Sequence, residues 1–424
     1  MRKLSFVAVA AVAAMTLAGC AGGGGTKAPA ADEKPGNIRV WLVGTDTPQA
    51  ARDLLKTQFE AQNPGSTLTI EEQSWTGLVD KLTTSLSGSD SPDVVEVGNT
   101  QAAAFTSSGA FLDLTKYYKE LGGDDLLPGF VEAGSYDGKF YAAPLYSGSR
   151  LVFYKKDALA AAGLSVPTTL DQYISNAETL ATDNPGKSGI WWPGQDWYNA
   201  LPFIWENGGE VAVFKDGKWD AQFSSAGSQA GLKEVQDLMT KASAAPKDGQ
   251  ETNPQVGFCD GTTLQLSAPS WVKWSILAPT DAATPGCPDQ EANLGVYALP
   301  GKNGGAAKVF AGGSNIGISA KSAHPQLALK ALKIILGKEF QTIYGTNGLV
   351  PALKSLASTL GTDDVAKAIA AAAGNARLTP ASPKWADVES AHVLQDFFVQ
   401  IAQGGDIASL SKALDEKIES ILNG

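Results

Sequence analysis

The sequence is poor in histidine, with only His324 and His392 among 424 residues. The two lie far apart in the chain and both fall in helical patterns, so we expect no metal site built on histidine. Basic residues are also scarce, since 33 lysines and arginines stand against 44 aspartates and glutamates, a formal net charge of −11. This balance argues against binding to nucleic acid or to anionic lipid, because both attract cationic proteins. We expect neither a metal nor another cofactor.

Long apolar runs are absent beyond the N-terminus, so no membrane-spanning helix is expected in the body of the chain. The N-terminal run, residues 4–18, follows Arg2 and Lys3. It is shorter than the roughly 20 residues of a membrane span. Basic residues followed by a short apolar stretch are typical of a secretory signal peptide. We therefore predict that residues 1–19 are a signal peptide, and the cysteine that follows it, Cys20, makes it a lipoprotein signal peptide.

Cysteine is rare, with three residues in the chain. The first, Cys20, ends the tetrapeptide LAGC, which resembles the cleavage site of bacterial lipoproteins, where the cysteine receives a diacylglycerol. Residues 20–36 are rich in Gly, Ala and Pro, which predicts a lipidated flexible tether. Two or more acyl chains give stable anchoring, so we place the protein outside the cell, on the outer face of the cytoplasmic membrane. An ordinary secretory leader with an incidental cysteine is the alternative.

The other two cysteines, Cys259 and Cys287, form an even pair in what would be an oxidising compartment. We predict a disulfide between them, closing a loop of about 28 residues. Two free buried thiols are the alternative, and the spacing does not separate the two.

Strand and helix patterns alternate through the first part of the chain. Residues 38–43 predict a buried strand, and residues 48–62 predict an amphipathic helix. Further strands are expected at residues 67–73 and 93–97, with a helical pattern between them. Repeated strand-helix-strand units predict an α/β fold with a doubly wound parallel sheet.

The length of the chain exceeds the usual limit of about 250 to 300 residues for a single core, so we expect two domains. A second domain begins near residue 148, and residues 309–319, VFAGGSNIGIS, return to the first. Such repeated crossing predicts a multi-strand hinge with a cleft between two lobes. The expected lobes are an N-terminal lobe of residues 37–147 and 306–355, and a C-terminal lobe of residues 148–305 and 356–424.

Five short stretches in a consistent order form a family pattern: FEAQNPGSTLTIEEQSW, SPDVVEVGNTQAAAFTSSGAFLDLT, DGKFYAAPLYSGSRLVFYKKD, FIWENGG and AGGSNIGIS. From about residue 38 to its end, the chain resembles the extracellular solute-binding proteins of carbohydrate ABC importers in bacteria. The segments EVGNTQ, PGQDWY and APKDGQETNPQ are similar to actinobacterial binding proteins for N,N'-diacetylchitobiose and N-acetylglucosamine. The segment LYSGSR looks more like the pattern of general oligosaccharide binders.

This resemblance implies a two-lobe periplasmic-binding-protein fold, each lobe a sheet flanked by helices, which closes about its hinge over an oligosaccharide. It also implies partners, namely the transmembrane permease subunits of an ABC importer and their ATPase. We expect a monomer that binds N,N'-diacetylchitobiose or a chito-oligosaccharide. Another di- or oligosaccharide of the maltose, cello or xylo type is an alternative, as are a secreted glycoside hydrolase and a sugar sensor.

Aromatic residues crowd residues 191–209, WWPGQDWYNALPFIWENGG, a stretch broken by prolines and glycines. A pyranose carries hydroxyls on its rim and C–H groups on its faces, so flat rings flanked by amides and carboxylates complement it. We expect Trp197 to stack on the sugar, with Gln195 as a polar contact and Tyr198 beside it.

The remaining tryptophans divide into pocket and core candidates. Trp271 is expected as a second stacking ring, in preference to Trp274, because it matches the family's pocket aromatic. Trp75 directly follows a predicted strand, at a position where ligands contact such sheets. Core roles are expected for the rest of those considered: Trp41, Trp205, and one of Trp191 and Trp192.

Polar candidates lie beyond the carboxyl ends of the predicted strands and at the expected domain crossing. Glycines in the segment GGSN would allow the backbone to approach a ligand closely. A turn cap or a hinge salt bridge is the alternative for each candidate. The predicted contacts are Asp46, Asn99, Gln101, Tyr146, Arg150, Gly313 and Asn315.

Catalytic motifs are not found. Residues 312–316, GGSNI, lack the final glycine of a nucleophile elbow, and ATDNPGKS lacks the first glycine of a phosphate-binding loop. No pair of carboxylates lies in a motif that singles it out for glycoside hydrolysis, although 44 acidic residues keep that class open. We therefore expect a binding protein and not an enzyme.

Overall fold

The computed structural model describes residues 34–282 and 284–424. The predicted signal peptide, the predicted lipidation site Cys20 and most of the predicted tether lie outside these residues. Across the described ranges, no helix combines the length and apolar character needed to cross a bilayer.

Three parallel strands form the sheet of the first lobe, as the alternating pattern predicts. β1 (Asn37–Val43) lies between β2 (Thr67–Gln73) and β3 (Val94–Gly98). Helix α1 (Gln49–Gln62) connects β1 to β2, and α2 (Leu78–Ser87) connects β2 to β3. The carboxyl ends of all three strands therefore meet at one edge of the sheet.

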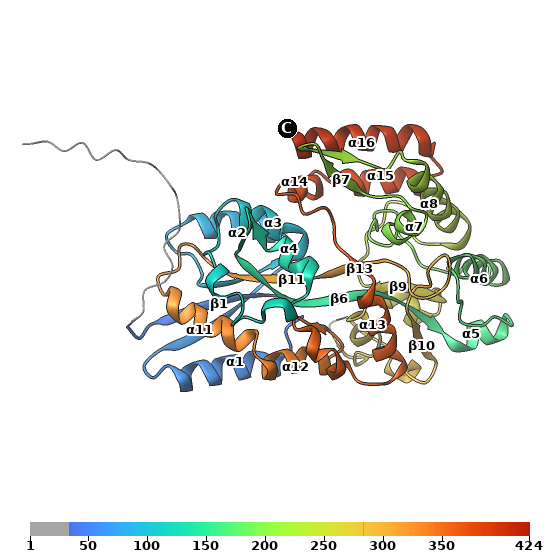
Figure 1. Ribbon diagram of the computed structural model, residues 1–424. Helices are drawn as coiled ribbons and strands as arrows, with labels where there is room; N and C mark the ends of the chain where they lie inside the picture. Colours follow the sequence, from blue (N-terminus) through green and yellow to red (C-terminus); the bar gives the residue numbers. More distant parts are fainter. Residues whose placement is uncertain (1–33, 283) are drawn as a thin grey trace, which may run out of the picture.

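Two long strands carry the sheet from one lobe into the other (Figure 1). β6 (Ala142–Lys155) and β11 (Val309–Ile318) pair antiparallel, and β11 also pairs antiparallel with β3. In the second lobe, β9 (Gln265–Pro269) and β10 (Leu294–Tyr297) both pair antiparallel with β6. In the described residues the strands lie in the order β10-β6-β11-β3-β1-β2, so one hydrogen-bonded sheet runs through both lobes.

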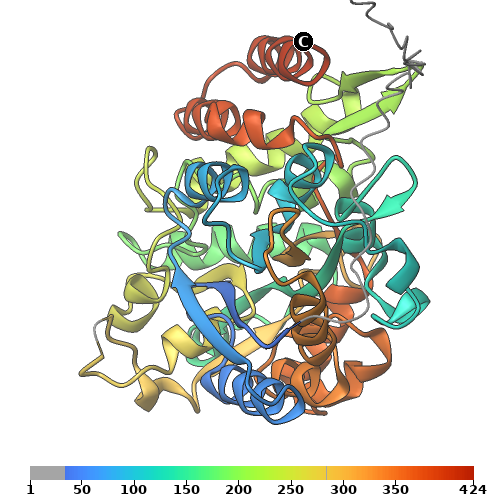
Figure 2. The ribbon, with the colours of Figure 1, turned by 90° about the vertical axis from the view of Figure 1, so that its left-hand side faces the viewer.

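Side chains alternate between the two faces of β1 and supply two cores. Val40 and Leu42 pack into one cluster, whereas Trp41 and Val43 pack into another. Helix α1 covers the first face together with α11 (Pro325–Ile335), as Figure 2 shows. Trp41 is 4% exposed, which confirms its expected structural role.

The second lobe has its own large core, to which C-terminal segments contribute. Helices α8 (Ala226–Asp237), α15 (Val393–Ala402) and α16 (Ile407–Asn423) pack together at the top of Figure 1. Helix α14 (Trp385–Ser390) belongs to this core but also contacts α3 (Asn99–Ser107) of the first lobe.

The remaining elements complete the two lobes. The further helices are α4 (Pro128–Ala133), α5 (Lys156–Ala161), α6 (Leu170–Asp183), α7 (Leu201–Glu206), α9 (Gln255–Asp260), α10 (Val272–Ile276), α12 (Lys338–Thr346) and α13 (Asp364–Gly374). The short strands are β4 (Ser135–Tyr136), β5 (Lys139–Phe140), β7 (Ala212–Lys215), β8 (Lys218–Ala221), β12 (Val350–Pro351) and β13 (Ala376–Arg377).

Candidate functional site

A cavity of about 490 Å³ lies between the two lobes, beyond the carboxyl ends of β1 and β3 and beside β6. Ligand sites for small organic molecules have volumes of about 300 to 1,000 Å³. We call this cavity the cleft. Its lining residues are Asp46, Trp75, Gly98, Asn99, Thr100, Gln101, Tyr146, Arg150, Tyr198, Glu251, Pro269, Trp271, Phe310, Gly312 and Gly313.

The structure brings together most of the residues proposed from the sequence, although they come from segments more than 260 positions apart. Their contact with a ligand stays a prediction. The predicted residues that line the cleft are Asp46, Trp75, Asn99, Gln101, Tyr146, Arg150, Tyr198, Trp271 and Gly313.

Trp197 does not line the cleft, and the expectation that its ring faces a sugar is wrong. Its side chain is 1% exposed and belongs to the core of the second lobe. The ring lies 3.9 Å from that of Tyr198, measured between centroids, and 6.5 Å from that of Trp385. Trp197 therefore packs behind Tyr198, which lines the cleft.

Gln195 and Asn315 are also outside the cleft lining, because both amides serve the fold. The Gln195 Nε2 group donates to the Asp248 carbonyl at 2.7 Å. Asn315 is fully buried, and its Nδ2 group donates to the carbonyls of Phe130 at 2.8 Å and Ala142 at 3.3 Å. Its position in the segment GGSN suggested a ligand contact, but its side chain ties α4 to β6.

Trp75 and Trp271 present aromatic surface to the cleft from different parts of the chain. Trp75 is 43% exposed, and its Nε1 group donates to Asp46 Oδ2 at 3.2 Å. Trp271 lies against the backbone of the shared strands. A Cβ atom at Gly148 would come within 2.0 Å of its ring, and one at Gly312 within 3.2 Å. Glycine at position 148 is therefore needed for this placement of the indole.

Tyr198 supplies a third ring, on the side of the second lobe. It stacks on Phe310 of β11, with centroids 4.8 Å apart and planes inclined by 29°. The Arg150 guanidinium lies 5.4 Å from the Tyr198 centroid. Phe310 lines the cleft although the sequence reading did not select it, because a phenylalanine inside a strand is more often core.

A carboxylate stands at the end of β1. Asp46 Oδ2 accepts hydrogen bonds from Trp75 Nε1 and, at 3.0 Å, from the Tyr146 hydroxyl. Burial raises the Asp46 pKa, although both of these hydrogen bonds oppose the shift. Behind them, Glu96 of β3 is fully buried, and burial raises its pKa to about 8. Asp46 and Tyr146 thus form one polar wall of the cleft.

Arg150 of β6 organises the opposite polar wall. It is 3% exposed, and its Nη1 group donates to Glu251 Oε1 at 2.9 Å and to Asn199 Oδ1 at 3.0 Å. Asp196 lies 3.8 Å from its Nη2 atom. Burial and the nearby Glu251 raise the Asp196 pKa above its usual range. Two carboxylates thus face one guanidinium, so this wall has no unpaired positive charge.

Glu251 and Thr100 were missed by the sequence reading. A signal for Glu251 existed, since it lies in the segment APKDGQETNPQ that carries the family resemblance. Thr100 stands between Asn99 and Gln101, both of which were selected, at the start of α3. Its hydroxyl donates to Glu389 Oε2 at 2.9 Å, a contact across 289 positions that no local pattern indicates.

The remaining tryptophans follow the expected division. Trp192 and Trp205 are 1% and 2% exposed, which confirms core roles for them. Trp274 is 39% exposed and does not line the cleft.

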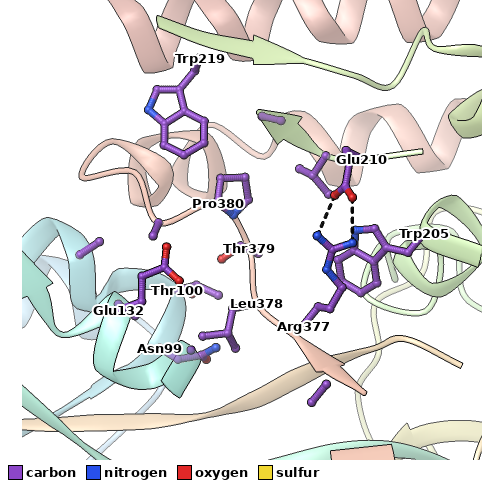
Figure 3. Close-up of a pocket in the computed structure, with 17 residues that line it drawn as sticks. Asn99, Thr100, Glu132, Trp205, Glu210, Trp219, Arg377, Leu378, Thr379 and Pro380 are labelled. Carbon is purple, nitrogen blue, oxygen red and sulfur yellow. Dashed lines mark hydrogen bonds and ion pairs between the residues drawn. The ribbon is translucent and has the colours of Figure 1, made fainter. Parts of the chain in front are cut away.

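A second cavity, of about 300 Å³, lies between the lobes on the other side of the α3 N-terminus (Figure 3). It shares Asn99 and Thr100 with the cleft. Arg377 forms two hydrogen bonds of 2.9 Å with the Glu210 carboxylate, and its guanidinium lies 5.1 Å from the centroid of the Trp205 ring. This ion pair fixes the segment that leaves β13 against the second lobe.

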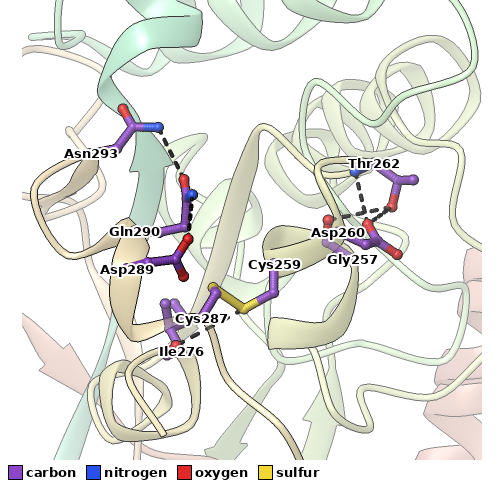
Figure 4. The surroundings of a disulfide bond; sticks show 9 residues. All are labelled: Gly257, Cys259, Asp260, Thr262, Ile276, Cys287, Asp289, Gln290 and Asn293. Atoms are coloured by element: carbon purple, nitrogen blue, oxygen red, sulfur yellow. Dashed lines mark hydrogen bonds between the residues drawn. A yellow bond between two sulfur atoms is a disulfide. The ribbon is translucent and has the colours of Figure 1, made fainter. Parts of the chain in front are cut away.

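Cys259 and Cys287 form the predicted disulfide (Figure 4). Cys259 lies in α9, and the Cys287 N–H donates to the carbonyl of Ile276, the last residue of α10, at 2.7 Å. Trp271 immediately precedes α10. The disulfide therefore braces the segment that carries a cleft aromatic, without lining the cleft itself.

No group of three or more His, Cys, Asp and Glu side chains that could hold a metal ion occurs in the part of the chain that the structure describes.

The sequence is similar to those of bacterial extracellular solute-binding proteins. The family model described as "Bacterial extracellular solute-binding protein" matches residues 44–342. The diacetylchitobiose-binding protein DasA of Streptomyces coelicolor is 31% identical over 424 residues, covering 97% of each chain. The multiple sugar-binding protein of Streptococcus mutans is 25% identical over 374 residues, covering 84% of this chain and 83% of that protein.

Solved structures show the same fold. The GacH receptor of Streptomyces glaucescens, described unliganded and with acarbose, superposes with a TM-score of 0.79 at 20% identity, covering 92% of this chain and 99% of that chain. The sugar-binding protein MalE of Xanthomonas citri superposes with a TM-score of 0.77 at 22% identity, covering 91% and 97%. The predicted two-lobe α/β architecture is confirmed.

Proposed function

Because the chain belongs to the bacterial extracellular solute-binding protein family, we propose that it is the sugar-capturing component of an ABC importer, with N,N'-diacetylchitobiose or a longer chito-oligosaccharide as its ligand. Family members bind solutes and are not enzymes, and we propose that this protein likewise releases its sugar unchanged. The observation that carries the proposal is the cleft between the lobes, with aromatic rings and paired polar groups on its walls.

The chemistry of the cleft suits a neutral saccharide. Trp75, Trp271 and Tyr198 offer flat apolar surface for the C–H faces of pyranose rings. Asp46 and Glu251 supply carboxylate acceptors, while Gln101 supplies an amide, so hydroxyl and acetamido groups both find partners. The similarity to DasA, whose name specifies diacetylchitobiose, supports the choice of sugar.

We propose that closure of the lobes and the expected N-terminal anchor serve the delivery of the sugar to the cell. Sugar contacts from both lobes favour the closed arrangement, and closure creates a surface that permease subunits can recognise. A lipid on Cys20 and a flexible tether over residues 20–36 would hold a monomer close to those subunits and their ATPase. Deleting the gene should abolish uptake of the sugar while leaving other carbon sources unaffected.

Calorimetry of the purified protein tests the proposal. The titrants are N,N'-diacetylchitobiose, N-acetylglucosamine, maltose, cellobiose and xylobiose. We expect a Kd of about 1 μM or lower for diacetylchitobiose, about −8 kcal/mol. Tightest binding of another disaccharide would replace the proposed sugar. Absence of binding to all of them would contradict the function, and product analysis after long incubation would reveal hydrolysis.

A further inference from the structure

The Glu389 carboxylate does not itself line the cleft, but it lies directly behind two residues that do, Thr100 and Gln101. Its Oε2 atom accepts hydrogen bonds from Thr100 Oγ1 at 2.9 Å and from Gln101 Nε2 at 3.1 Å. Its Oε1 atom accepts from Trp385 Nε1 at 3.0 Å. Burial raises the Glu389 pKa, and the three hydrogen bonds oppose that shift.

These hydrogen bonds join the two lobes. Trp385 is fully buried in the core of the second lobe, one turn before Glu389 on α14. Thr100 and Gln101 lie in the first turn of α3, a helix whose Ala102 and Phe105 pack in a core of the first lobe. Glu389 therefore fixes one lobe against the other at the edge of the cleft.

The same contact determines which end of the Gln101 amide faces the cleft. A carboxylate can only accept hydrogen bonds, so the Gln101 group that faces Glu389 must be the NH₂ donor. Its Nε2 atom also lies 2.9 Å from Thr100 Oγ1. The Oε1 atom consequently lies on the opposite side, over Gly98, where a Cβ atom would come within 2.3 Å of it. Gly98 and Gln101 both line the cleft.

We propose that Glu389 is a positioning residue for saccharide binding, which holds the Gln101 amide with its oxygen toward the cleft as a hydrogen-bond acceptor. This inference rests on the proposed function. A sugar hydroxyl or the N–H of an acetamido group is the donor that such an oxygen accepts. The orientation depends on α14 and α3 being in contact, so the acceptor is presented only while the lobes hold this arrangement.

A double-mutant cycle measured by calorimetry with N,N'-diacetylchitobiose tests the inference. We expect Glu389→Ala and Gln101→Ala each to weaken binding by about tenfold, the effect of one lost hydrogen bond to a ligand. The double variant should bind no more weakly than Gln101→Ala alone, because Glu389 acts through that amide. In contrast to Glu389→Ala, the variant Glu389→Gln keeps an acceptor for Gln101. Its affinity should lie within about threefold of that of the unmodified protein.

Asp387→Ala is the matched control, since Asp387 is an exposed acid on the same helix and does not line the cleft. It should leave affinity unchanged. Unchanged affinity in Glu389→Ala, or an equal loss of affinity in the Gln101→Ala background, would overturn the positioning role while the proposed function stands. An unmodified protein that binds no saccharide would overturn both, and thermal unfolding of each variant checks that it is folded.

Discussion

At the scale of single residues, we expect the aromatic rings that line the cleft to be the side chains whose substitution weakens saccharide binding most. Removing a stacking ring exposes sugar C–H surface to water and removes a specific contact. We expect Trp75→Ala and Trp271→Ala each to weaken saccharide binding at least about tenfold, as measured by calorimetry. Trp274→Ala, which removes an exposed indole outside the cleft, is the control and should bind normally.

Trp197 shows why a sequence pattern can identify a segment that reaches the cleft without identifying the ring that lines it. The segment PGQDWY does reach the cleft, but through Tyr198, while the adjacent indole turns into the core. Trp197→Ala should therefore act on stability, lowering the free energy of unfolding by about 3 to 5 kcal/mol. A variant whose free energy of unfolding equals that of the unmodified protein, but which fails to bind sugar, would contradict this assignment.

Glu96 should make stability depend on pH. Its folded pKa of about 8 lies above the ordinary value of 4.5, because burial disfavours the charged carboxylate. Between these values the folded chain holds a proton that the unfolded chain releases, so the free energy of unfolding falls as pH rises. We expect a lower melting temperature at about pH 8 than at about pH 5.

Glu96→Gln should reduce that fall, because an amide keeps an oxygen for the Val43 N–H, which donates to Glu96 Oε2 at 2.8 Å, and does not titrate. Some pH dependence of the same sign remains from Asp46, Asp196 and Glu389, whose pKa values are also raised by burial. Equal pH dependence in the variant and the unmodified protein would rule out Glu96 as the source.

At the scale of elements, the Cys259–Cys287 disulfide joins α9 to the chain that follows α10. Closing a loop of 28 residues restricts the unfolded chain, which in the chain-entropy model stabilises the fold by about 3 to 4 kcal/mol. We expect the double variant Cys259→Ser, Cys287→Ser to unfold at lower temperature in calorimetric scans. Reducing agent should lower the unfolding temperature of the unmodified protein similarly and leave that of the variant unchanged.

The long strands β6 and β11 explain why element prediction worked better in the first lobe than between the lobes. The parallel strands β1, β2 and β3 follow from local alternation of apolar runs and helices. The antiparallel pairing of β6 with β9 joins residues more than 110 positions apart, and no local pattern specifies it. The cost of closing a loop rises only slowly with its length, so a strand can pair with many distant partners at similar cost. Sequence periodicity does not tell these partners apart.

At the scale of the whole molecule, binding should change the shape as well as the stability. A ligand that contacts both lobes stabilises the closed arrangement over an open one. We expect the radius of gyration from small-angle scattering to decrease when diacetylchitobiose is added. At a sugar concentration of about 100 times the Kd, the free energy of unfolding should rise by about 2.7 kcal/mol. Increased stability with no change in scattering would mean that the lobes are already closed without sugar.

The sequence predicted a disulfide between Cys259 and Cys287 but left two free thiols as the alternative, and the structure decided for the disulfide. The sequence by itself determined the α/β class and the strand ends and turns that carry Asp46, Trp75 and Gln101. These are encoded locally, by periodicity, punctuation and residue chemistry. Only the tertiary structure decided that Trp197 is core and Asn315 a structural amide, and that Glu389 reaches Gln101 from 288 positions away. Those roles depend on which face of a segment meets which neighbour, and packing between distant segments settles that question.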